Sequence, residues 1–273
     1  MNDAACSTRY PILLVHGAGF RDLKSPVYWG RIPKALEMRG ARLYYGEQDC
    51  WASTDDNARA LLERIRTICD ETSCGKMNII AHSKGGLEAR MAASSLGGNC
   101  LIASITTVAT PHRGSKTIDR LLRFPHSAFN LAAFAVNNWI RLIGDRKPDF
   151  LRVINDFTTE HMQDFNAKNP DVSDVFYQSI ACVMKHPWSD INLSTANLVV
   201  GRLEGPNDGL VSVESAAWGK RCRVITGAGW RGISHLDAID LRRAPLSRSG
   251  TDGICDIIDL YIDIVMSLKS RGL

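Results

Sequence analysis

Strand-like apolar runs alternate with amphipathic segments along the first 115 residues. The runs cover residues 11–15, 42–45, 77–81 and 101–109, and such runs are typical of parallel strands whose sheet is covered on both faces. Between them, apolar residues recur at helical spacing, as in residues 58–69. The alternation predicts an α/β fold with a mostly parallel central sheet and helices on both of its faces.

Residues 116–174 break this alternation, because they contain helical patterns but no strand-like run. Helices are predicted over residues 118–124, 128–143 and 150–165. The middle segment is rich in apolar residues, yet it is too short and too polar to span a bilayer. An insertion at the rim of a sheet can cover an apolar site, so we predict a helical lid. A helical layer that only packs against the sheet is the alternative.

The strand pattern resumes in the last third of the chain. Strands are predicted over residues 175–183, 197–200 and 221–225. Residues 254–268 place apolar side chains on one helical face and aspartates on the other, which indicates a packing helix rather than a membrane anchor. We therefore expect a single α/β domain over residues 1–273, with the lid inserted at residues 116–174.

A serine lies where the apolar run at residues 77–81 stops and a helical pattern starts. A serine on such a sharp strand-to-helix turn exposes its hydroxyl beside the backbone N–H groups of the helix N-terminus. The small residues Ala81 and Gly85, two positions before and after Ser83, let the turn close. The pattern is A-x-S-x-G rather than G-x-S-x-G, and an ordinary turn capped by a serine is the alternative.

A second small-residue loop, H-G-A-G-F at residues 16–20, follows the first predicted strand. Ligands of open α/β sheets bind at the carboxyl ends of the strands. We interpret the backbone N–H groups of Ala18 and Lys84 as the two halves of an oxyanion hole. The loop has neither the G-x-G-x-x-G nor the Walker pattern of a phosphate-binding loop. A glycine-rich connection without a role is the alternative.

Asp208 and His235 complete a candidate catalytic set with Ser83, each in a loop predicted to follow a strand. The order serine, aspartate, histidine along the chain is that of α/β-hydrolases. In this chemistry the histidine takes the serine proton and returns it to the leaving group. The aspartate fixes the imidazole tautomer and stabilises the imidazolium.

Other side chains compete for these roles. Among the seven histidines, His82 adjoins the serine but is predicted to point to the opposite side of its strand. His16 and His112 are expected to organise loops through hydrogen bonds. Asp237 lies only two residues from His235, where a carboxylate is poorly placed to meet that imidazole. The remaining histidines lie in or beside the insertion, at His126, His161 and His186.

Composition narrows the function classes. A chain of 273 residues with 45% hydrophobic and 23% charged content is large enough for one sizeable core. The net charge is +4, but Lys and Arg are scattered among 29 acidic residues, so no nucleic acid partner is expected. The first ten residues resemble no signal peptide, so we expect a cytoplasmic protein, or a secreted one whose leader has been removed.

The eight cysteines form no C-x-x-C pair and show no Cys/His spacing of a zinc site. A domain of this size does not need cross-links, so reduced thiols are expected in preference to a disulfide framework.

Five motifs occur in a fixed order: HGAGF at residues 16–20, AHSKGG at 81–86, TPHRGS at 110–115, NDGLV at 207–211 and SHLD at 234–237. Together they resemble the motifs of bacterial triacylglycerol lipases, with the closest likeness to the clostridial-type lipase and polyesterase branch. The resemblance spans essentially the whole chain. It implies an α/β-hydrolase fold with a helical lid and the hydrolysis of carboxylic esters.

The resemblance also bears on metals. Several of these lipases bind calcium through an aspartate two residues after the catalytic histidine, a position that Asp237 occupies here. The sequence does not identify a partnering aspartate, and a hydrogen bond that braces the loop is the alternative. Some relatives hold zinc with a His-rich insertion, but residues 21–80 contain no histidine, so no zinc is expected. No cofactor is therefore required, and calcium is the one metal to test.

The sequence thus predicts a serine carboxylic-ester hydrolase that acts on lipid-type acyl esters through an acyl-enzyme on Ser83. A short-chain esterase, thioesterase or acyltransferase that uses the same three residues is the alternative. A non-catalytic module that binds lipid or a protein partner through residues 128–143 is a third reading.

Overall fold

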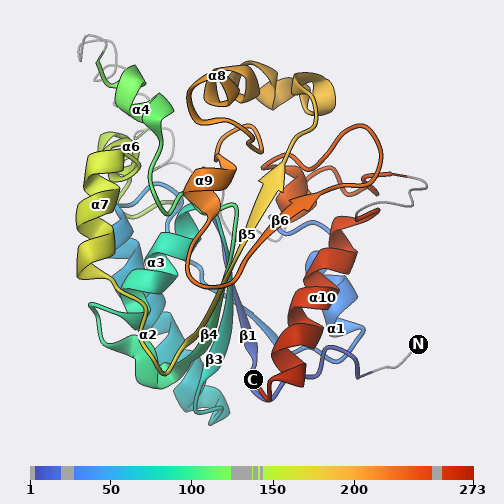
Figure 1. Ribbon diagram of the computed structural model, residues 1–273. Helices are drawn as coiled ribbons and strands as arrows, with labels where there is room; N and C mark the ends of the chain where they lie inside the picture. The colour runs from blue at the N-terminus through green and yellow to red at the C-terminus, as the bar shows by residue number, and fades with distance from the viewer. Residues whose placement is uncertain (1–3, 20–27, 124–136, 138–140, 142–143, 248–253) are drawn as a thin grey trace.

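Six strands form one sheet in the order β2-β1-β3-β4-β5-β6 (Figure 1). The structure is a computed structural model that describes residues 4–19, 28–123, 137, 141, 144–247 and 254–273. All neighbouring strands pair in parallel, which confirms the predicted fold class. The strands are β1 (Ile12–Val15), β2 (Leu43–Tyr45), β3 (Met77–His82), β4 (Ile102–Val108), β5 (Phe176–Val183) and β6 (Cys222–Thr226).

Helices cover both faces of this sheet. In Figure 1, α2 (Thr54–Thr72) and α3 (Lys84–Ala93) lie on one face, while α1 (Ile32–Glu37) and α10 (Ile257–Ser270) lie on the other. Alternate side chains of a strand point to opposite faces, so β1 sends Leu13 into the core under α2 and Leu14 into the core under α10. This double burial explains why the central strands are apolar at nearly every position.

The region of the predicted insertion contains three described helices and no described strand. They are α4 (Lys116–Leu121), α6 (Phe150–Asp156) and α7 (Thr159–Lys168). The helix predicted over 150–165 is divided in two, because Thr158 caps α7 by accepting a hydrogen bond from the His161 N–H at 3.2 Å. The predicted helix over residues 128–143 lies outside the described residues, apart from residues 137 and 141.

The predicted strand over residues 197–200 is wrong, because these residues belong to the helix α8 (Ser194–Glu204). Only three of these residues are apolar, and so short a run has no period that separates a strand from a helix. In α8 the run is amphipathic, with Val200 buried and Leu198 and Val199 exposed. Asp208 therefore follows a helix, and its loop returns to the end of β5, where the Met184 N–H donates to the Asn207 carbonyl at 2.9 Å.

Short elements complete the loops at this end of the sheet. They are the 3-10 turns η2 (Pro187–Ser189), η3 (Ile191–Leu193) and η4 (Asp237–Ile239), and the helix α9 (Val213–Ala216). At the amino end of β4, η1 (Gly98–Leu101) leads into the strand. Within the described ranges, no helix combines the length and the apolar character that crossing a membrane requires.

Candidate active site

Ser83 forms the turn between β3 and α3 in a backbone conformation that is strained for a residue with a side chain. Its φ is 53° and its ψ is −129°. The turn closes because glycines follow two and three positions after Ser83: a Cβ at Gly85 would lie 2.4 Å from the His16 carbonyl oxygen. A Cβ at Gly86 would lie 2.2 Å from the Thr110 hydroxyl oxygen. The requirement for small residues around Ser83 is thus steric and local.

Ser83 and His235 line one cavity of about 390 Å³ at the carboxyl ends of the strands, and Ala18 lines it as well. Most of the remaining wall is apolar, as in sites that bind small organic molecules. The predicted insertion and α8 both contribute to this wall. Their lining residues are Thr117, Ile118, Ile154, Phe157, Ala196 and Val200.

Asp208 and His235 are joined by a hydrogen bond of 2.8 Å between Oδ2 and the ring Nδ1. The other carboxylate oxygen accepts from the N–H groups of Leu210 and Val211, at 3.0 and 2.8 Å. The His235 N–H donates to the Asp208 carbonyl at 2.7 Å. Because Nδ1 donates its proton to the carboxylate, the lone pair of the imidazole is on Nε2. Such a ring can accept a proton from a hydroxyl in the cavity.

The two predicted oxyanion donors lie on either side of Ser83. Lys84 is the first residue of α3, and Ala18 lies in the loop after β1. Among the described residues, neither backbone N–H is hydrogen bonded to an acceptor. The loop also approaches the serine closely, since a Cβ at Gly17 would lie 2.8 Å from the Ser83 Cβ. Both donors are therefore free to bind an oxygen atom beside Ser83.

The prediction that His82 points away from the site is wrong. Its ring centroid lies 4.4 Å from that of His235, and its side chain lines the cavity. The sharp turn at Ser83 ends the strand alternation on which the prediction relied. Burial, followed by the proximity of His235, lowers the pKa of His82 well below 6.5, so the ring is neutral.

Tyr28 connects His82 to the loop after β1, which contains the predicted oxyanion donor Ala18, and no local pattern in the sequence marks this contact. The Tyr28 hydroxyl accepts from the Gly17 N–H at 2.9 Å and lies 2.7 Å from the His82 Nδ1. The His82 tautomer decides which of the hydroxyl and Nδ1 donates in this second contact. One hydroxyl therefore fixes the backbone next to Ala18 and orients the ring next to His235.

The Lys84 side chain belongs to a second buried network that the sequence did not reveal. Its ammonium pairs with the Glu88 carboxylate one turn along α3, and both side chains are 1% exposed. Glu88 also accepts from Asn57 at 2.8 Å and from Gln48 at 3.1 Å. The Gln48 amide donates to the His16 carbonyl at 3.0 Å. The network thereby ties the start of α3 to the strand end that leads into the oxyanion loop.

His16 and His112 organise loops, as predicted. The two ring nitrogens of His16 lie 2.8 Å from the Gly17 carbonyl oxygen and 2.9 Å from that of Gln48. His112 is buried, with ring nitrogens 3.2 Å from the Arg90 guanidinium and 2.9 Å from the Thr107 hydroxyl. Burial, followed by the charge of Arg90, lowers the pKa of His112 well below 6.5.

Asp237 makes contacts that do not fit a calcium ligand. One carboxylate oxygen accepts from the Arg242 Nε, and the other accepts from the Ser234 N–H at 3.2 Å and lies 3.8 Å from Arg231. A second carboxylate, Asp190, accepts from the Ser234 hydroxyl at 2.8 Å. Two guanidinium groups thus stand where a cation with six to eight oxygen ligands would need room. Among the described residues, no group of three or more His, Cys, Asp or Glu could hold a metal.

Comparisons with known proteins agree on one class. A triacylglycerol lipase of Vibrio cholerae is 30% identical over an alignment of 295 residues. The alignment covers 97% of this chain and 89% of that protein. Triacylglycerol lipase 2 of Saccharomyces cerevisiae is 28% identical over 258 residues, covering 90% of this chain and 74% of that protein. The crystal structure of a metagenomic carboxyl esterase shares the fold, with a TM-score of 0.70 and 16% identity over 97% of this chain and 76% of that one. No model of a protein family matches the chain.

Proposed function

The chain belongs to the triacylglycerol lipase family, and from this membership we propose that it hydrolyses lipid-type esters through an acyl-enzyme on Ser83. Carboxylic-ester hydrolysis follows from its homologues. The acyl-enzyme, the roles of the three residues and triacylglycerol as substrate are the proposal. One observation carries it: His235, hydrogen bonded to Asp208, lines the same cavity as Ser83.

In the first half-reaction, His235 Nε2 takes the proton from Ser83 as its Oγ attacks the ester carbonyl carbon. The Asp208 carboxylate stabilises the imidazolium that forms. The negative charge on the former carbonyl oxygen is bound by the N–H groups of Ala18 and Lys84. As the tetrahedral intermediate collapses, His235 gives its proton to the leaving alcohol.

In the second half-reaction, water attacks the acyl group on Ser83 and gives a proton to His235. The bond between the acyl carbon and the serine oxygen then breaks, and His235 returns the proton to Ser83. The fatty acid is released and the enzyme is restored. The networks of Tyr28 and Glu88 support both steps, because they hold the two oxyanion donors at fixed positions.

We also propose that two segments cover the acyl group. Residues 116–174 contribute Ile118, Ile154 and Phe157 to the cavity wall, and α8 contributes Ala196 and Val200. Apolar side chains from both segments suit a hydrocarbon chain, whose burial is favourable by about 0.8 kcal/mol per CH₂. The lid would therefore consist of the predicted insertion together with α8.

The cavity size favours a short-chain esterase as the second candidate. Its volume of about 390 Å³ lies near the lower end of the roughly 300–1,000 Å³ found for ligand pockets. A series of p-nitrophenyl esters and emulsified triacylglycerols separates the two functions. A lipase hydrolyses the emulsified substrate, whereas an esterase loses activity as the acyl chain lengthens.

Replacement of Ser83 by Ala tests the proposal. The variant should lose the hydrolysis of p-nitrophenyl butyrate while its circular dichroism stays that of the wild type. Ser270, an exposed serine at the end of α10, is the matched control, and its replacement by Ala should leave activity unchanged. Turnover by the Ser83→Ala variant at the wild-type rate would refute the assignment of the nucleophile.

A further inference from the structure

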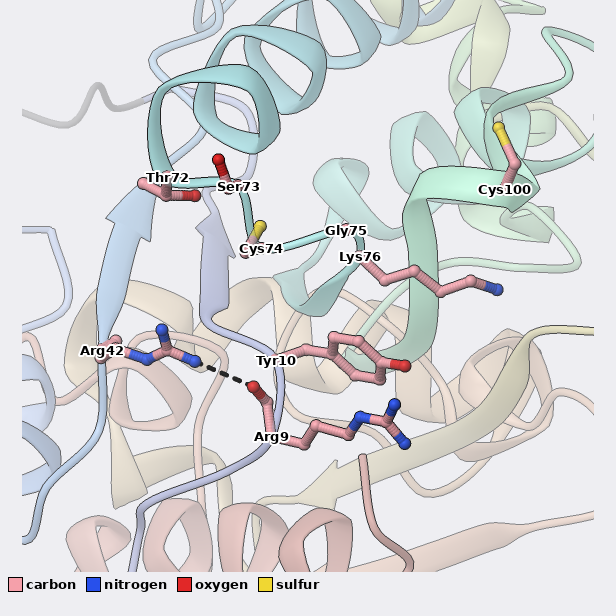
Figure 2. A pocket seen from close by; sticks show the side chains of 9 residues that line it. All are labelled: Arg9, Tyr10, Arg42, Thr72, Ser73, Cys74, Gly75, Lys76 and Cys100. Atoms are coloured by element: carbon pink, nitrogen blue, oxygen red, sulfur yellow. Dashed lines mark hydrogen bonds between the residues drawn. The ribbon is translucent and has the colours of Figure 1, made fainter.

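A second pocket lies at the opposite end of the sheet from Ser83 (Figure 2). Four of its lining residues lie one or two positions before neighbouring strands: Tyr10 before β1, Arg42 before β2, Lys76 before β3 and Cys100 before β4. The pocket is open and has a volume of about 570 Å³. None of the groups proposed for ester hydrolysis contributes to it.

The charge of this pocket is positive. Arg9, Arg42 and Lys76 line it, and no lining residue is acidic. The Arg42 guanidinium donates to the Arg9 carbonyl at 2.8 Å, as the dashed line in Figure 2 shows. The Arg9 guanidinium lies over the Tyr10 ring, 5.1 Å from its centroid. Three cations at one open pocket attract small anions and raise their local concentration.

Two thiols meet at the edge of this pocket. Cys69 lies in the last turns of α2, and Cys74 returns toward it because Ser73 and Gly75 adopt left-handed backbone conformations, with φ of 52° and 73°. The two sulfur atoms are 3.5 Å apart. Cys74 is half-buried and lines the pocket, whereas Cys69 is buried. Neither Cys69 nor Cys74 is part of a disulfide.

We propose that Cys69 and Cys74 are a reversible redox pair, oxidised by an anionic low-molecular-weight disulfide such as glutathione disulfide that docks in the basic pocket. The carboxylates of the reagent would pair with Arg9 and Lys76. Its sulfur atoms would then lie near Cys74, the member of the pair that the pocket exposes.

The reaction takes place in two exchanges. The Cys74 thiolate attacks one sulfur of the reagent, which forms a mixed disulfide and releases one small thiolate. The Cys69 thiolate then attacks the Cys74 Sγ, which forms the Cys69–Cys74 bond and releases the second small thiolate. The two protons of the protein thiols end on the two released thiols. Two electrons leave the cysteines and reduce one reagent disulfide.

The order of the two thiols follows from their surroundings. Burial, together with the contact with Cys74, raises the pKa of Cys69 to about 12, so Cys69 is a poor first nucleophile. Once Cys74 is part of a mixed disulfide, its thiol no longer opposes the ionisation of Cys69. The buried thiol is then held next to the sulfur atom that it must attack.

The test is incubation of the full chain with glutathione disulfide, followed by mass spectrometry of the intact protein and its peptides. In the wild type this pair should lose two hydrogen atoms without gaining an adduct, and the peptides should show the Cys69–Cys74 bond. Cys69→Ser should stop at one glutathione adduct on Cys74, and Cys74→Ser should form neither product at this site. Cys222→Ser, which removes an exposed thiol on β6, is the control that should still form the bond.

The role of the pocket is tested by the charge of the reagent. Lys76→Gln should slow the reaction with glutathione disulfide several-fold and leave the reaction with the neutral bis(2-hydroxyethyl) disulfide unchanged. If Lys76→Gln changed the rates with the two reagents by the same factor, docking in the basic pocket would be refuted. A stable adduct on wild-type Cys74, without the Cys69–Cys74 bond, would refute the redox pair. Ester hydrolysis by each variant reports folding and should equal that of the wild type.

Discussion

The two ends of the parallel sheet carry pockets of opposite character. At the carboxyl ends, apolar walls surround Ser83 and His235, and buried hydrogen bonds fix the groups around them. At the amino ends, the pocket is open and basic, and two of its lining residues are cysteines. Ester hydrolysis needs donors that are already in place when charge develops, which buried networks provide. Capture of a dissolved anion needs accessible charge, which the open pocket provides. If both proposals hold, one sheet separates ester hydrolysis from thiol oxidation.

The largest effect is expected from Asp208→Asn, at the carboxyl end. The amide would keep the size of the side chain but favour the wrong imidazole tautomer, so kcat should fall by about 10⁴. Steady-state hydrolysis of p-nitrophenyl butyrate measures this loss. Asp263→Asn, on the exposed face of α10, is the matched control. A fall of less than tenfold would mean that Asp208 does not orient His235.

Gly17→Ala should have the next largest effect. The new methyl group would lie 2.8 Å from the Ser83 Cβ and 3.1 Å from the Tyr28 hydroxyl, so the oxyanion loop must shift. Loss of one oxyanion donor typically lowers kcat by about 10²–10³. Gly201→Ala in α8 is the control, because the nearest atom to its Cβ would be 3.5 Å away. A kcat equal to that of the wild type in Gly17→Ala would contradict the assignment of the Ala18 N–H as an oxyanion donor.

Tyr28→Phe should reduce kcat by about 10–100-fold with little change in KM, since an unsatisfied buried donor costs about 1–3 kcal/mol. The variant leaves the Gly17 N–H and the His82 Nδ1 without the hydroxyl. Tyr177→Phe is the control, because its hydroxyl bonds to Val172 away from the cavity. A change in KM alone would indicate a role in substrate binding instead.

Acid should destabilise the protein through histidines at the carboxyl end. His82 and His112 have lowered pKa values, so below pH 6.5 the unfolded state binds protons that the native state does not. The free energy of unfolding should fall by up to about 1.4 kcal/mol per pH unit for each histidine. Urea denaturation at pH 7 and pH 5.5 measures this slope.

Asp237 changes the free energy of unfolding in the opposite direction as the pH falls. Burial raises its pKa to about 6, so as the pH falls through 6 the native state takes up a proton that the unfolded state takes up only near 3.8. This uptake offsets part of the loss caused by the histidines. Below pH 6 the net slope should therefore be shallower than the two histidines alone would give. His112→Asn should reduce the slope near pH 5.5 by about one proton, and an unchanged slope would exclude His112 as its source.

The smallest effect is expected from removing calcium. Arg242 and Arg231 already neutralise Asp237, so treatment with EDTA should leave ester hydrolysis unchanged. Calorimetric titration with calcium should show no binding. Activation by calcium, with loss of that activation in Asp237→Asn, would show that the arginine side chains move aside for the metal.

The central strands could be predicted from the sequence, because burial on both faces produces continuous apolar runs such as residues 77–81. The run at residues 197–200 misled the prediction, since its three apolar residues are too few to separate a strand from a helix with apolar side chains on both faces. The positions of Ser83, Asp208 and His235 in loops could also be predicted, and in the structure a hydrogen bond joins Asp208 to His235. Their order along the chain carried that signal.

The supporting contacts could not be predicted. Tyr28 meets His82, and Gln48 meets Glu88, only because segments far apart in the sequence pack together in the fold. No local pattern marks either pair. The orientation of His82 was missed for a related reason, since a strand period does not continue through a strained turn.

Labelling with a fluorophosphonate probe tests the central claim most directly, because the probe reacts with a serine only when its hydroxyl is activated. The full chain is labelled and digested, and the modified peptide is identified by mass spectrometry. The account predicts one adduct, on Ser83, which is lost in Ser83→Ala and strongly reduced in Asp208→Asn. Absence of labelling in the folded wild type, or an adduct on another serine, would contradict it.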